Sequence, residues 1–347
     1  MAIIEPSQGA MTPAQMITLL AHMIPAGHNV LMTGAPGTGK SDIVAQSTKH
    51  AGFELVITHP VVSDPTDFKG MPWVIDGTHA EFLPFGDLLK MMNAEKPTVV
   101  FFDDLGQAPP AVQAATMQLL LSRQINGKKV SDMVTFLAAT NRKMDRAGVS
   151  GILEPVKSRF WTIVELKTDI DDWCTWGFKN EVETDVIAFL RARPNLLHDF
   201  KPSSDMSNSP CPRTWKFVSD MMKLQLPREI EYKAYSGAVG QGAAGELSAF
   251  LKIKRTLVPA DMIIMNPDSC DVPTEPDALY ATTVGLAAKT TEATIGRVMK
   301  YVKRLPKEFG VLLVRDALRK YDEKEQRALI QTRPMIEWQI RNKDVML

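Results

Sequence analysis

The sequence predicts an α/β fold over its first half, a parallel sheet with helices on both faces, followed by a helical second half. Two observations predict this fold. Up to Leu166, short apolar runs alternate with segments of helical periodicity, which is the pattern of repeated βα units. After Leu166 the strand signal fades and only helical periodicity remains. With 347 residues and 45% hydrophobic side chains, the chain is large and apolar enough for two or three units with a substantial core.

The first half opens with a helix and continues as alternating strands and helices. Pro13 follows Thr12, and apolar residues then recur along one side up to Met23, which predicts a short helix with a capped start. Strands are expected at 28–33, 53–58, 98–102, 133–139 and 161–166, with helices at 41–50, 86–93 and 109–122. This alternation of apolar runs and helices indicates a parallel sheet that is covered on both faces.

The second half is expected to be helical throughout. Helical periodicity predicts a lid with helices at about 170–178, 184–193, 213–224, 231–239 and 246–255. The last segment, from about 277 to 340, has the same periodicity, and basic and acidic residues are mixed through 320–327 as on a solvated face. It is a C-terminal extension whose purpose the sequence does not specify.

The overall composition narrows the function classes. Forty basic and forty acidic side chains cancel, so there is no global attraction to nucleic acid or to an anionic membrane. The N-terminus lacks a signal-peptide pattern and no apolar run is long enough to span a bilayer, so we expect no membrane insertion. Three scattered cysteines without CxxC spacing are expected to be reduced thiols in the cytoplasm.

A glycine-rich motif stands between the first expected strand and the helix that follows it. The motif fits G-x-x-x-x-G-K-[ST] and comprises Gly34, Ala35, Pro36, Gly37, Thr38, Gly39, Lys40 and Ser41. In such a loop, backbone N–H groups and the helix N-terminus converge on phosphate oxygens, Lys40 reaches the β and γ phosphates, and Ser41 ligates magnesium. The alternative, an accidental glycine-rich turn, leaves the register of strand, motif and helix unexplained. The sequence therefore predicts a P-loop NTPase that binds Mg-ATP.

Two adjacent carboxylates end the strand expected at 98–102. A buried strand tolerates Asp103 and Asp104 only at its carboxyl end, which is the edge where parallel sheets bind ligands. We expect Asp103 to hold the magnesium shell and Asp104 to polarise the attacking water. The alternative for Asp104 is that it only caps the helix that follows.

With both motifs placed, the chain resembles the AAA+ superfamily, and within it the MoxR-like group of the dynein-related branch. The resemblance covers about 13–250. The group usually has Asp-Glu where this sequence has Asp103-Asp104. A shorter aspartate places its carboxylate about one methylene further from the water, which puts fast hydrolysis in question but not nucleotide binding.

The resemblance implies two further residues at the nucleotide. Asn141 ends the strand expected at 133–139, as the family's sensor-1 residue does, and would orient water against the γ phosphate. An ordinary turn Asn is the alternative. Arg159 lies in a segment similar to the one that carries the arginine finger, so it would enter a neighbouring subunit's site. A surface salt bridge is the alternative, with Arg142 and Arg146 as substitutes for the finger.

A third residue comes from the second half. Arg213 follows Pro212 at the start of a helix similar to the family's sensor-2 helix, which implies contact with the γ phosphate of the same subunit. The alternative is an arginine that only caps or snorkels from the helix start. If these roles hold, ATP bridges core, lid and neighbour, and hydrolysis changes the angle between them.

The resemblance also includes an insertion at 64–73. Gly77 then suits a hairpin turn, and Asn126-Gly127 predicts a second, smaller hairpin. In the related group such insertions face the pore or the client. Three aromatic side chains could therefore grip a polypeptide, with buried packing as the alternative: Trp73, Phe82 and Phe85.

Motifs and resemblance together predict a nucleotide-binding core at 1–167, a helical lid at 168–256 and a helical extension at 257–347. The function expected is that of a ring-forming, Mg-ATP-dependent ATPase, a homo-hexamer that remodels or matures a protein client. The resemblance implies a von Willebrand factor A-type protein as a partner. One alternative is a nucleic-acid motor or loader, which would need a basic, aromatic-lined path.

Another alternative is a nucleotide-gated scaffold that hydrolyses little because of Asp104. ATP is preferred over GTP because the sequence has nothing like the guanine-reading Asn-Lys-x-Asp loop, although relatives vary. The six histidines are scattered without ligand spacing, so no metal other than magnesium is expected.

Overall fold

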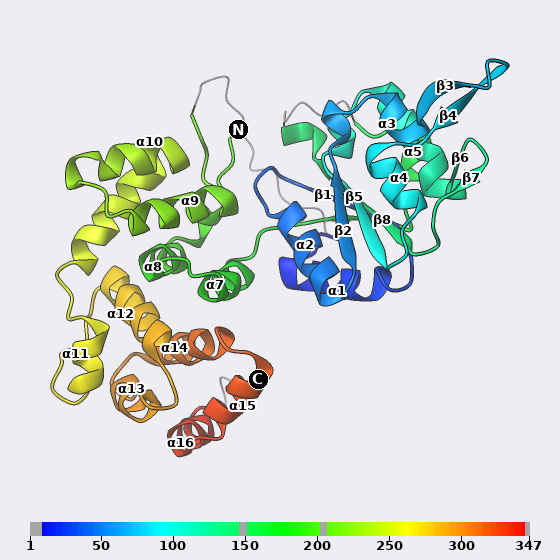
Figure 1. Ribbon diagram of the computed structural model, residues 1–347. Coiled ribbons are helices and arrows are strands. Elements are labelled where there is room, and N and C mark those ends of the chain that lie inside the picture. Colours follow the sequence, from blue (N-terminus) through cyan, green and yellow to red (C-terminus); the bar gives the residue numbers. More distant parts are fainter. Residues whose placement is uncertain (1–8, 146–150, 202–206, 344–347) are drawn as a thin grey trace. The chain divides into compact units, whose positions relative to one another are not determined.

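The computed structural model describes residues 9–145, 151–201 and 207–343 (Figure 1). The chain divides into two compact units, Met1–Thr168 and Asp169–Leu347. Within the described ranges, no helix is both long and apolar enough to cross a membrane.

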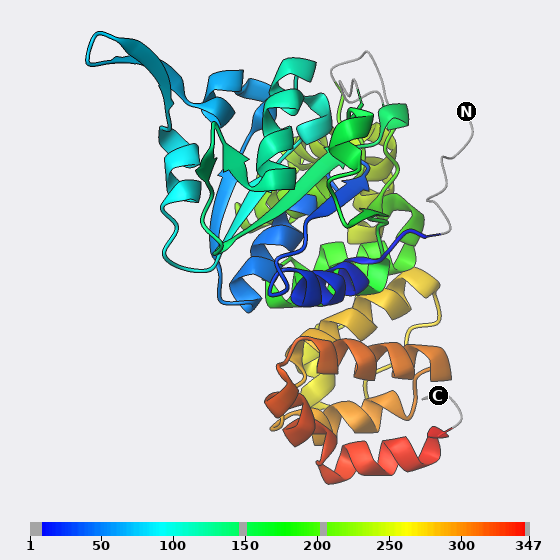
Figure 2. The same ribbon diagram turned by 90° about the vertical axis from the view of Figure 1, so that its right-hand side faces the viewer.

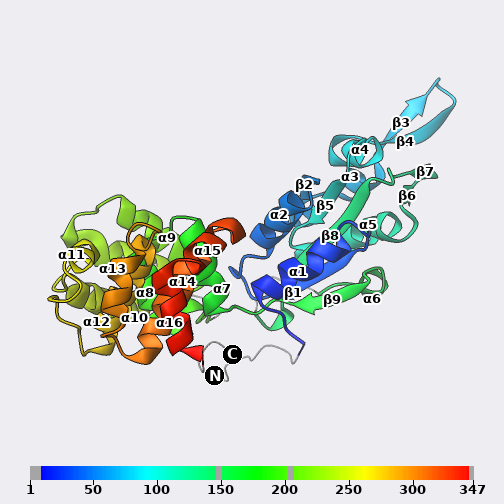
Figure 3. The same ribbon diagram turned by 90° about the horizontal axis from the view of Figure 1, so that it is seen from below.

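The first unit is built on a five-stranded parallel sheet in the order β2-β5-β8-β1-β9 (Figure 3). The strands are β1 (Val30–Gly34), β2 (Glu54–Thr58), β5 (Thr98–Phe102), β8 (Val134–Asn141) and β9 (Thr162–Glu165). All five lie where the apolar runs predicted strands, and every pairing between them is parallel. The predicted α/β fold class is therefore confirmed.

Helices cover both faces of this sheet. They are α1 (Pro13–Met23), α2 (Lys40–His50), α3 (Pro65–Lys69), α4 (Gly86–Met92), α5 (Pro110–Ser122) and α6 (Glu154–Lys157). Successive side chains of a strand point to opposite faces. Val30 and Met32 accordingly pack with α1 and α2, whereas Leu31 packs with α3 to α6 on the other face. Thr12 caps α1 in a capping box, as its position before Pro13 predicted.

Two hairpins extend from the first unit. β3 (Met71–Ile75) pairs with β4 (His79–Leu83), and β6 (Gln124–Ile125) pairs with β7 (Lys128–Lys129). Both hairpins were predicted from their glycine turns. The β3–β4 hairpin projects beyond the sheet and its helices (Figure 2). Trp73 is 61% exposed and Phe82 is 41% exposed, so the buried packing considered for them is not observed, whereas Phe85 is half-buried.

The second unit is helical. Its helices are α7 (Ile170–Lys179), α8 (Thr184–Ala192), α9 (Pro212–Lys223), α10 (Arg228–Lys254), α11 (Ala260–Met265), α12 (Pro276–Lys289), α13 (Ile295–Val302), α14 (Lys307–Arg319), α15 (Glu323–Ile330) and α16 (Arg333–Arg341). The two helices predicted within 231–255 are parts of α10, which is interrupted at Gly240, where φ is 78° and ψ is 161°. Helix α11 was not predicted, since Pro259 and its short length hide its periodicity.

Two hydrophobic clusters hold the second unit together. One is centred on Phe189, Trp215 and Phe250 of α8, α9 and α10, and the other joins α11 to α16. Val284 of α12 belongs to the first cluster, and α12 packs against both α8 and α14. The helices assigned to the lid and to the extension therefore form one compact unit.

Candidate functional site

The P-loop connects β1 to α2 at the carboxyl end of the sheet. Gly37 has φ of 74° and Gly39 has φ of 92°, in the left-handed region that glycine adopts without steric cost. The Thr38 hydroxyl donates to the Ala35 carbonyl (2.9 Å), which closes the loop on itself. Because α2 begins at Lys40, the N–H groups of its first turn lie at the loop, where an anion site needs donors.

Lys40 is held inside the loop by three acceptors. Its Nζ donates to the carbonyls of Gly34 and Ala35, both at 3.0 Å, and to Asn141 Oδ1 at 2.8 Å. The side chain is buried, so this ammonium depends on these acceptors in place of water. The loop thereby orients the cation at the place where a P-loop binds phosphate.

Ser41 and Asp103 form the oxygen pair expected to bind magnesium. The Ser41 hydroxyl donates to Asp103 Oδ2 at 2.8 Å, from the first turn of α2 to the residue after β5. The described residues contain no cluster of three or more His, Cys, Asp or Glu side chains suited to a metal. A hydroxyl and one carboxylate nevertheless fit Mg²⁺, which takes hard oxygen ligands and binds through one or two carboxylates plus substrate phosphates.

Asn141 links the P-loop lysine to the second carboxylate. It is the last residue of β8, the strand between β1 and β5. Its Oδ1 accepts from Lys40, and its Nδ2 donates to Asp104 Oδ1 at 3.2 Å. This amide orientation is the one that gives the ammonium an acceptor and the carboxylate a donor. Lys40, Asn141 and Asp104 thus form a continuous row, and Asn141 lies in a strand rather than in a turn.

Asp104 has an unusual backbone conformation. Its φ of 56° and ψ of 36° lie in the left-handed region, which is uncommon for a residue with a side chain. It precedes the short 3-10 helix Leu105–Gln107, but its side chain makes no capping hydrogen bond there. The capping alternative is therefore not observed, and the carboxylate is directed to Asn141.

A close approach fixes the turn after Asp104 against β8. A Cβ on Gly106 would lie 2.2 Å from Thr140 Oγ1 and 3.1 Å from Thr140 Cβ. Only glycine fits there without displacing the residue next to Asn141. No local pattern in the sequence marks Gly106, because the contact joins segments that are far apart in the chain.

Gln113 is a second residue that the sequence analysis missed. Its side chain is buried in α5, where Nε2 donates to the carbonyls of Ala108 (3.1 Å) and Gly151 (2.9 Å). Its Oε1 accepts from the Leu153 N–H at 3.0 Å. Gln113 thereby anchors the start of α6, the helix that precedes Arg159. A glutamine between apolar residues of an expected helix is the signal that could have revealed it.

Arg159 follows α6 and is half-exposed. Its Nη1 donates to Ser158 Oγ at 3.2 Å, and its buried Nε has no hydrogen-bond partner among the described residues. Among the described residues, Arg159 forms no ion pair. The surface salt bridge considered as the alternative is therefore not observed.

Arg142 and Arg146 are the two alternatives to Arg159 as the arginine finger. Arg142 forms ion pairs with Asp145 (2.9 Å) and Glu165 (3.0 Å) of its own unit. The hydrogen bond to Asp145 is the main cause that raises the pKa of Arg142. Its guanidinium is therefore occupied within the chain. Arg146 lies outside the described residues.

Arg213 is an exposed residue of the second unit, in the first turn of α9. The cap of this helix is supplied by other residues, since Thr214 Oγ1 accepts from the Cys211 N–H at 2.9 Å. Arg213 is thus not required to cap the helix, and its guanidinium extends from the surface of that unit.

Comparison with known proteins agrees with the site. Residues 30–167 match the family described as "ATPase family associated with various cellular activities (AAA)". Curated proteins gave no match. Among solved structures, the chain is similar to a RuvB mutant of Thermotoga maritima, with 16% identity, coverage of 80% of this chain and 83% of that chain, and a TM-score of 0.42.

The chain is also similar to NtrX from Brucella abortus in complex with ADP. The identity is 13%, the match covers 94% of this chain and 70% of that chain, and the TM-score is 0.43. The P-loop, the Ser41–Asp103 pair and the Lys40–Asn141–Asp104 row all lie inside the residues that match the family. Residues 30–167 therefore form an ATPase domain of the AAA family.

Proposed function

We propose that this chain is a ring-forming, Mg-ATP-dependent ATPase of the MoxR-like type that remodels or matures a protein client. The observation that carries the proposal is the row of Lys40, Asn141 and Asp104 beside the Ser41–Asp103 pair. This arrangement puts a cation, a neutral amide and a carboxylate in sequence next to a metal-binding oxygen pair, which is what phosphoryl transfer to water requires.

Each residue then has one task. Lys40 neutralises the β and γ phosphates, and Ser41 with Asp103 would hold Mg²⁺, which when bound neutralises further charge on the phosphate oxygens. Asp104 accepts the proton of the attacking water. Asn141, already bonded to Asp104, keeps that carboxylate and the water aligned with the γ phosphate.

Arg159 is proposed to complete the site of a neighbouring subunit. Support comes from its buried, unpartnered Nε and from exposed apolar residues beside it. Trp161 is 69% exposed and stacks on His28 at 3.7 Å, and Ile163 is 46% exposed. Exposed aromatic and aliphatic groups next to an arginine are typical of a subunit interface. We propose a homo-hexamer in which Arg213 contacts the γ phosphate from the lid.

The β3–β4 hairpin is proposed to contact the client. Its strand register puts Pro72, Val74, Ala80 and Phe82 on one face, and all four are exposed apolar residues. Trp73 extends from the other face. An exposed apolar face of this kind supports a protein client, and the resemblance to the MoxR-like group supports a von Willebrand factor A-type partner.

The ring is tested by mixing two inactive variants. Lys40→Ala removes the cation from a subunit's own site, whereas Arg159→Ala removes the finger that it offers to its neighbour. Each variant alone is expected to lose ATPase activity, and a mixture is expected to regain part of it because some sites combine an intact Lys40 with an intact Arg159. Mixing Arg159→Ala with the double variant is the control and should stay inactive. Failure of the first mixture, with both variants folded and associated, contradicts the role of Arg159 in trans.

A nucleotide-gated scaffold is the second candidate, and the short side chain of Asp104 favours it. Turnover by Asp104→Glu distinguishes the two. If the wild type is a motor, it exceeds Lys40→Ala in turnover, and glutamate at position 104 preserves or raises the rate. If the wild type binds ATP but turns over no faster than Lys40→Ala, whereas Asp104→Glu does turn over, the scaffold is the better account.

A further inference from the structure

The second unit buries an arginine between two of its helices. Arg191 of α8 has a side chain that is only 4% exposed, and Asp316 of α14 is fully buried. Arg191 Nε donates to Asp316 Oδ2 at 3.2 Å and Nη2 donates to Oδ1 at 2.6 Å, which is a bidentate pair. The remaining Nη1 donates to Asp171 of α7.

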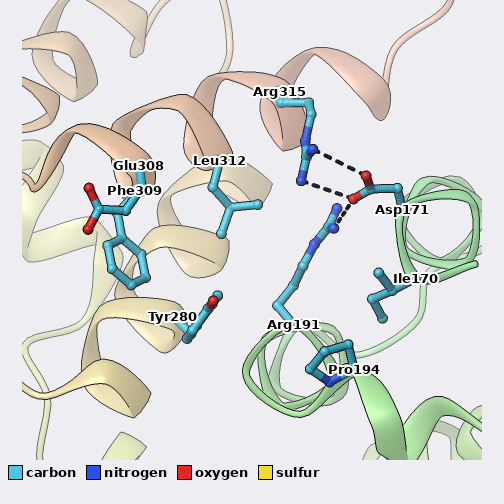
Figure 4. Close-up of a pocket in the computed structure, with 9 residues that line it drawn as sticks. All are labelled: Ile170, Asp171, Arg191, Pro194, Tyr280, Glu308, Phe309, Leu312 and Arg315. Atoms are coloured by element: carbon cyan, nitrogen blue, oxygen red, sulfur yellow. Dashed lines mark hydrogen bonds and ion pairs between the residues drawn. The ribbon is translucent and has the colours of Figure 1, made fainter. Parts of the chain in front are cut away.

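Asp171 extends this set of ion pairs back to α14. Arg315 Nη2 lies 2.9 Å from Asp171 Oδ1, and Nη1 donates to Oδ2 at 3.2 Å (Figure 4). Arg315 and Asp316 are consecutive on α14. Asp316, Arg191, Asp171 and Arg315 therefore form a chain of ion pairs that begins and ends on α14, where Arg315 and Asp316 are joined through the backbone. These four residues, here called the charge ring, link α7, α8 and α14. Arg319 of α14 adds a further contact to Asp171 at 3.4 Å.

A pocket of about 360 Å³ lies beside the charge ring (Figure 4). Asp171, Arg191 and Arg315 form its polar wall, and Tyr280 of α12 and Phe309 of α14 contact each other edge to face on its apolar side. The guanidinium groups of that wall are already neutralised by Asp171 and Asp316. The pocket thus lies at the interface between α7 and α8 on one side and α12 and α14 on the other.

Removing the charges of this ring from water costs free energy, which indicates a role other than simple stabilisation. Burial raises the pKa of Asp316 even though Arg191 opposes the shift. A buried ion pair commonly adds little net stability compared with apolar residues of the same size, whereas its geometry can specify one register of packing. The four side chains therefore define how α14 sits on α7 and α8. A second bidentate pair links the end of α8 to α12. Arg193 Nη1 donates to Asp277 Oδ1 at 2.9 Å, and Nη2 donates to Oδ2 at 3.1 Å.

We propose that the charge ring makes α11–α16, the C-terminal arm, a rigid extension of α7–α10, so that the arm turns with these helices when ATP is hydrolysed. The inference rests on the proposed function, in which hydrolysis changes the angle of the lid. The C-terminal arm then rotates together with the lid, and the charge ring is the contact that keeps the arm and α7–α10 in one fixed orientation relative to each other.

Distances between pairs of spin labels test this in the full-length chain. Exposed lysines give suitable sites: Lys49→Cys on α2, Lys223→Cys on α9 and Lys324→Cys on α15. The half-exposed Cys270 is replaced by serine, and Cys174 and Cys211 are buried. Each pair is measured with ADP and with a non-hydrolysable ATP analogue.

The two label pairs report on different claims. We expect the 223–324 distance to stay single and unchanged between the two nucleotides, while the 49–223 distance shifts. A 223–324 distance that changes with nucleotide overturns the rigid arm. A 49–223 distance that does not change overturns the lid rotation of the proposed function, and with it the movement of the arm.

Variants test whether the charge ring is the joint. The double variant Arg191→Met/Asp316→Leu removes both buried charges together and so leaves neither one orphaned. It is expected to broaden the 223–324 distance distribution, and Arg315→Gln, which opens the ring at its exposed side, is expected to broaden it less. The control Glu231→Gln/Arg255→Gln removes an ion pair within α10 and its cap and should leave the distribution narrow. A narrow distribution in both ring variants overturns the proposal.

Discussion

At the scale of single residues, the site depends on Asn141. One short amide bonds to the P-loop lysine on one side and to the second carboxylate on the other. The motifs predicted each member of this row separately, because each ends an apolar strand or completes a loop pattern. They could not predict that Asn141 holds both charges, since that contact depends on β8 lying between β1 and β5.

Asn141→Ala is expected to lower kcat by about 10²-fold, as for other preorganised polar groups in active sites. ATP affinity should change little, because Lys40 keeps its loop acceptors. The measurements are steady-state ATPase kinetics and nucleotide binding on the same preparation, with Asn93→Ala, an exposed helix-end asparagine, as control. An unchanged kcat, or a parallel loss of ATP binding, contradicts the assignment.

The residues that the sequence analysis missed share a physical reason. Gly106 and Gln113 carry no phosphate-binding or acid–base chemistry of their own, and they act by fitting against Thr140 and by anchoring α6. Such roles arise from contacts between distant segments, which neither periodicity nor spacing records.

At the scale of elements, two glycines differ in the space around them: Gly106 is closely packed, whereas Gly245 is open to solvent. Gly106→Ala puts a Cβ against Thr140 in the turn that follows Asp104, and we expect a destabilisation of about 1–3 kcal/mol, typical of overpacking. Gly245→Ala is the matched control, since a Cβ there meets nothing within 4 Å. Because Gly245 lies inside α10, alanine should stabilise by about 0.4–1 kcal/mol. Urea unfolding of both variants measures the difference, and equal effects would contradict the close contact.

A second element-scale prediction concerns Lys320, which caps the end of α12. Its Nζ donates to the carbonyls of Ala288 (2.8 Å) and Thr290 (2.5 Å), and burial lowers its pKa to about 8. Between that value and the ordinary lysine pKa, the unfolded chain binds more protons than the folded chain. The free energy of unfolding should therefore rise with pH in this window, relative to the variant Lys320→Met.

Urea unfolding of the wild type and of Lys320→Met at about pH 7 and about pH 10 measures this difference. The free energy of unfolding of the wild type should increase, relative to that of Lys320→Met, as the pH rises. A difference that does not depend on pH, or that shrinks at high pH, contradicts the lowered pKa.

Most elements were predictable because their signals are local. The five sheet strands are apolar runs, and α1 has a capping box with proline at its first position. The short helices α3 and α11 were missed, since one or two turns hold too few residues for a periodic pattern. Gly240, with φ of 78° and ψ of 161°, separates two helical segments within α10, and the sequence predicted two helices there.

At the scale of the whole molecule, the chain consists of a unit whose residues 30–167 match the AAA ATPase family and of a helical unit. The sequence predicted a core at 1–167, and the first compact unit is Met1–Thr168. The sequence also suggested a boundary near residue 257, but the helices on both sides of it share one hydrophobic cluster and the charge ring. Charges paired at this distance along the chain leave no local pattern, so the joint could not be predicted from the sequence.

The most direct test of the account is the steady-state ATPase rate per subunit with magnesium, measured across protein concentration for the wild type and for Lys40→Ala. For the wild type, the rate is expected to rise with concentration and then to reach a plateau as rings assemble. For Lys40→Ala, only a background rate is expected at every concentration. A rate per subunit that does not depend on concentration contradicts assembly of the site from two subunits. Hydrolysis that persists in Lys40→Ala contradicts the site itself.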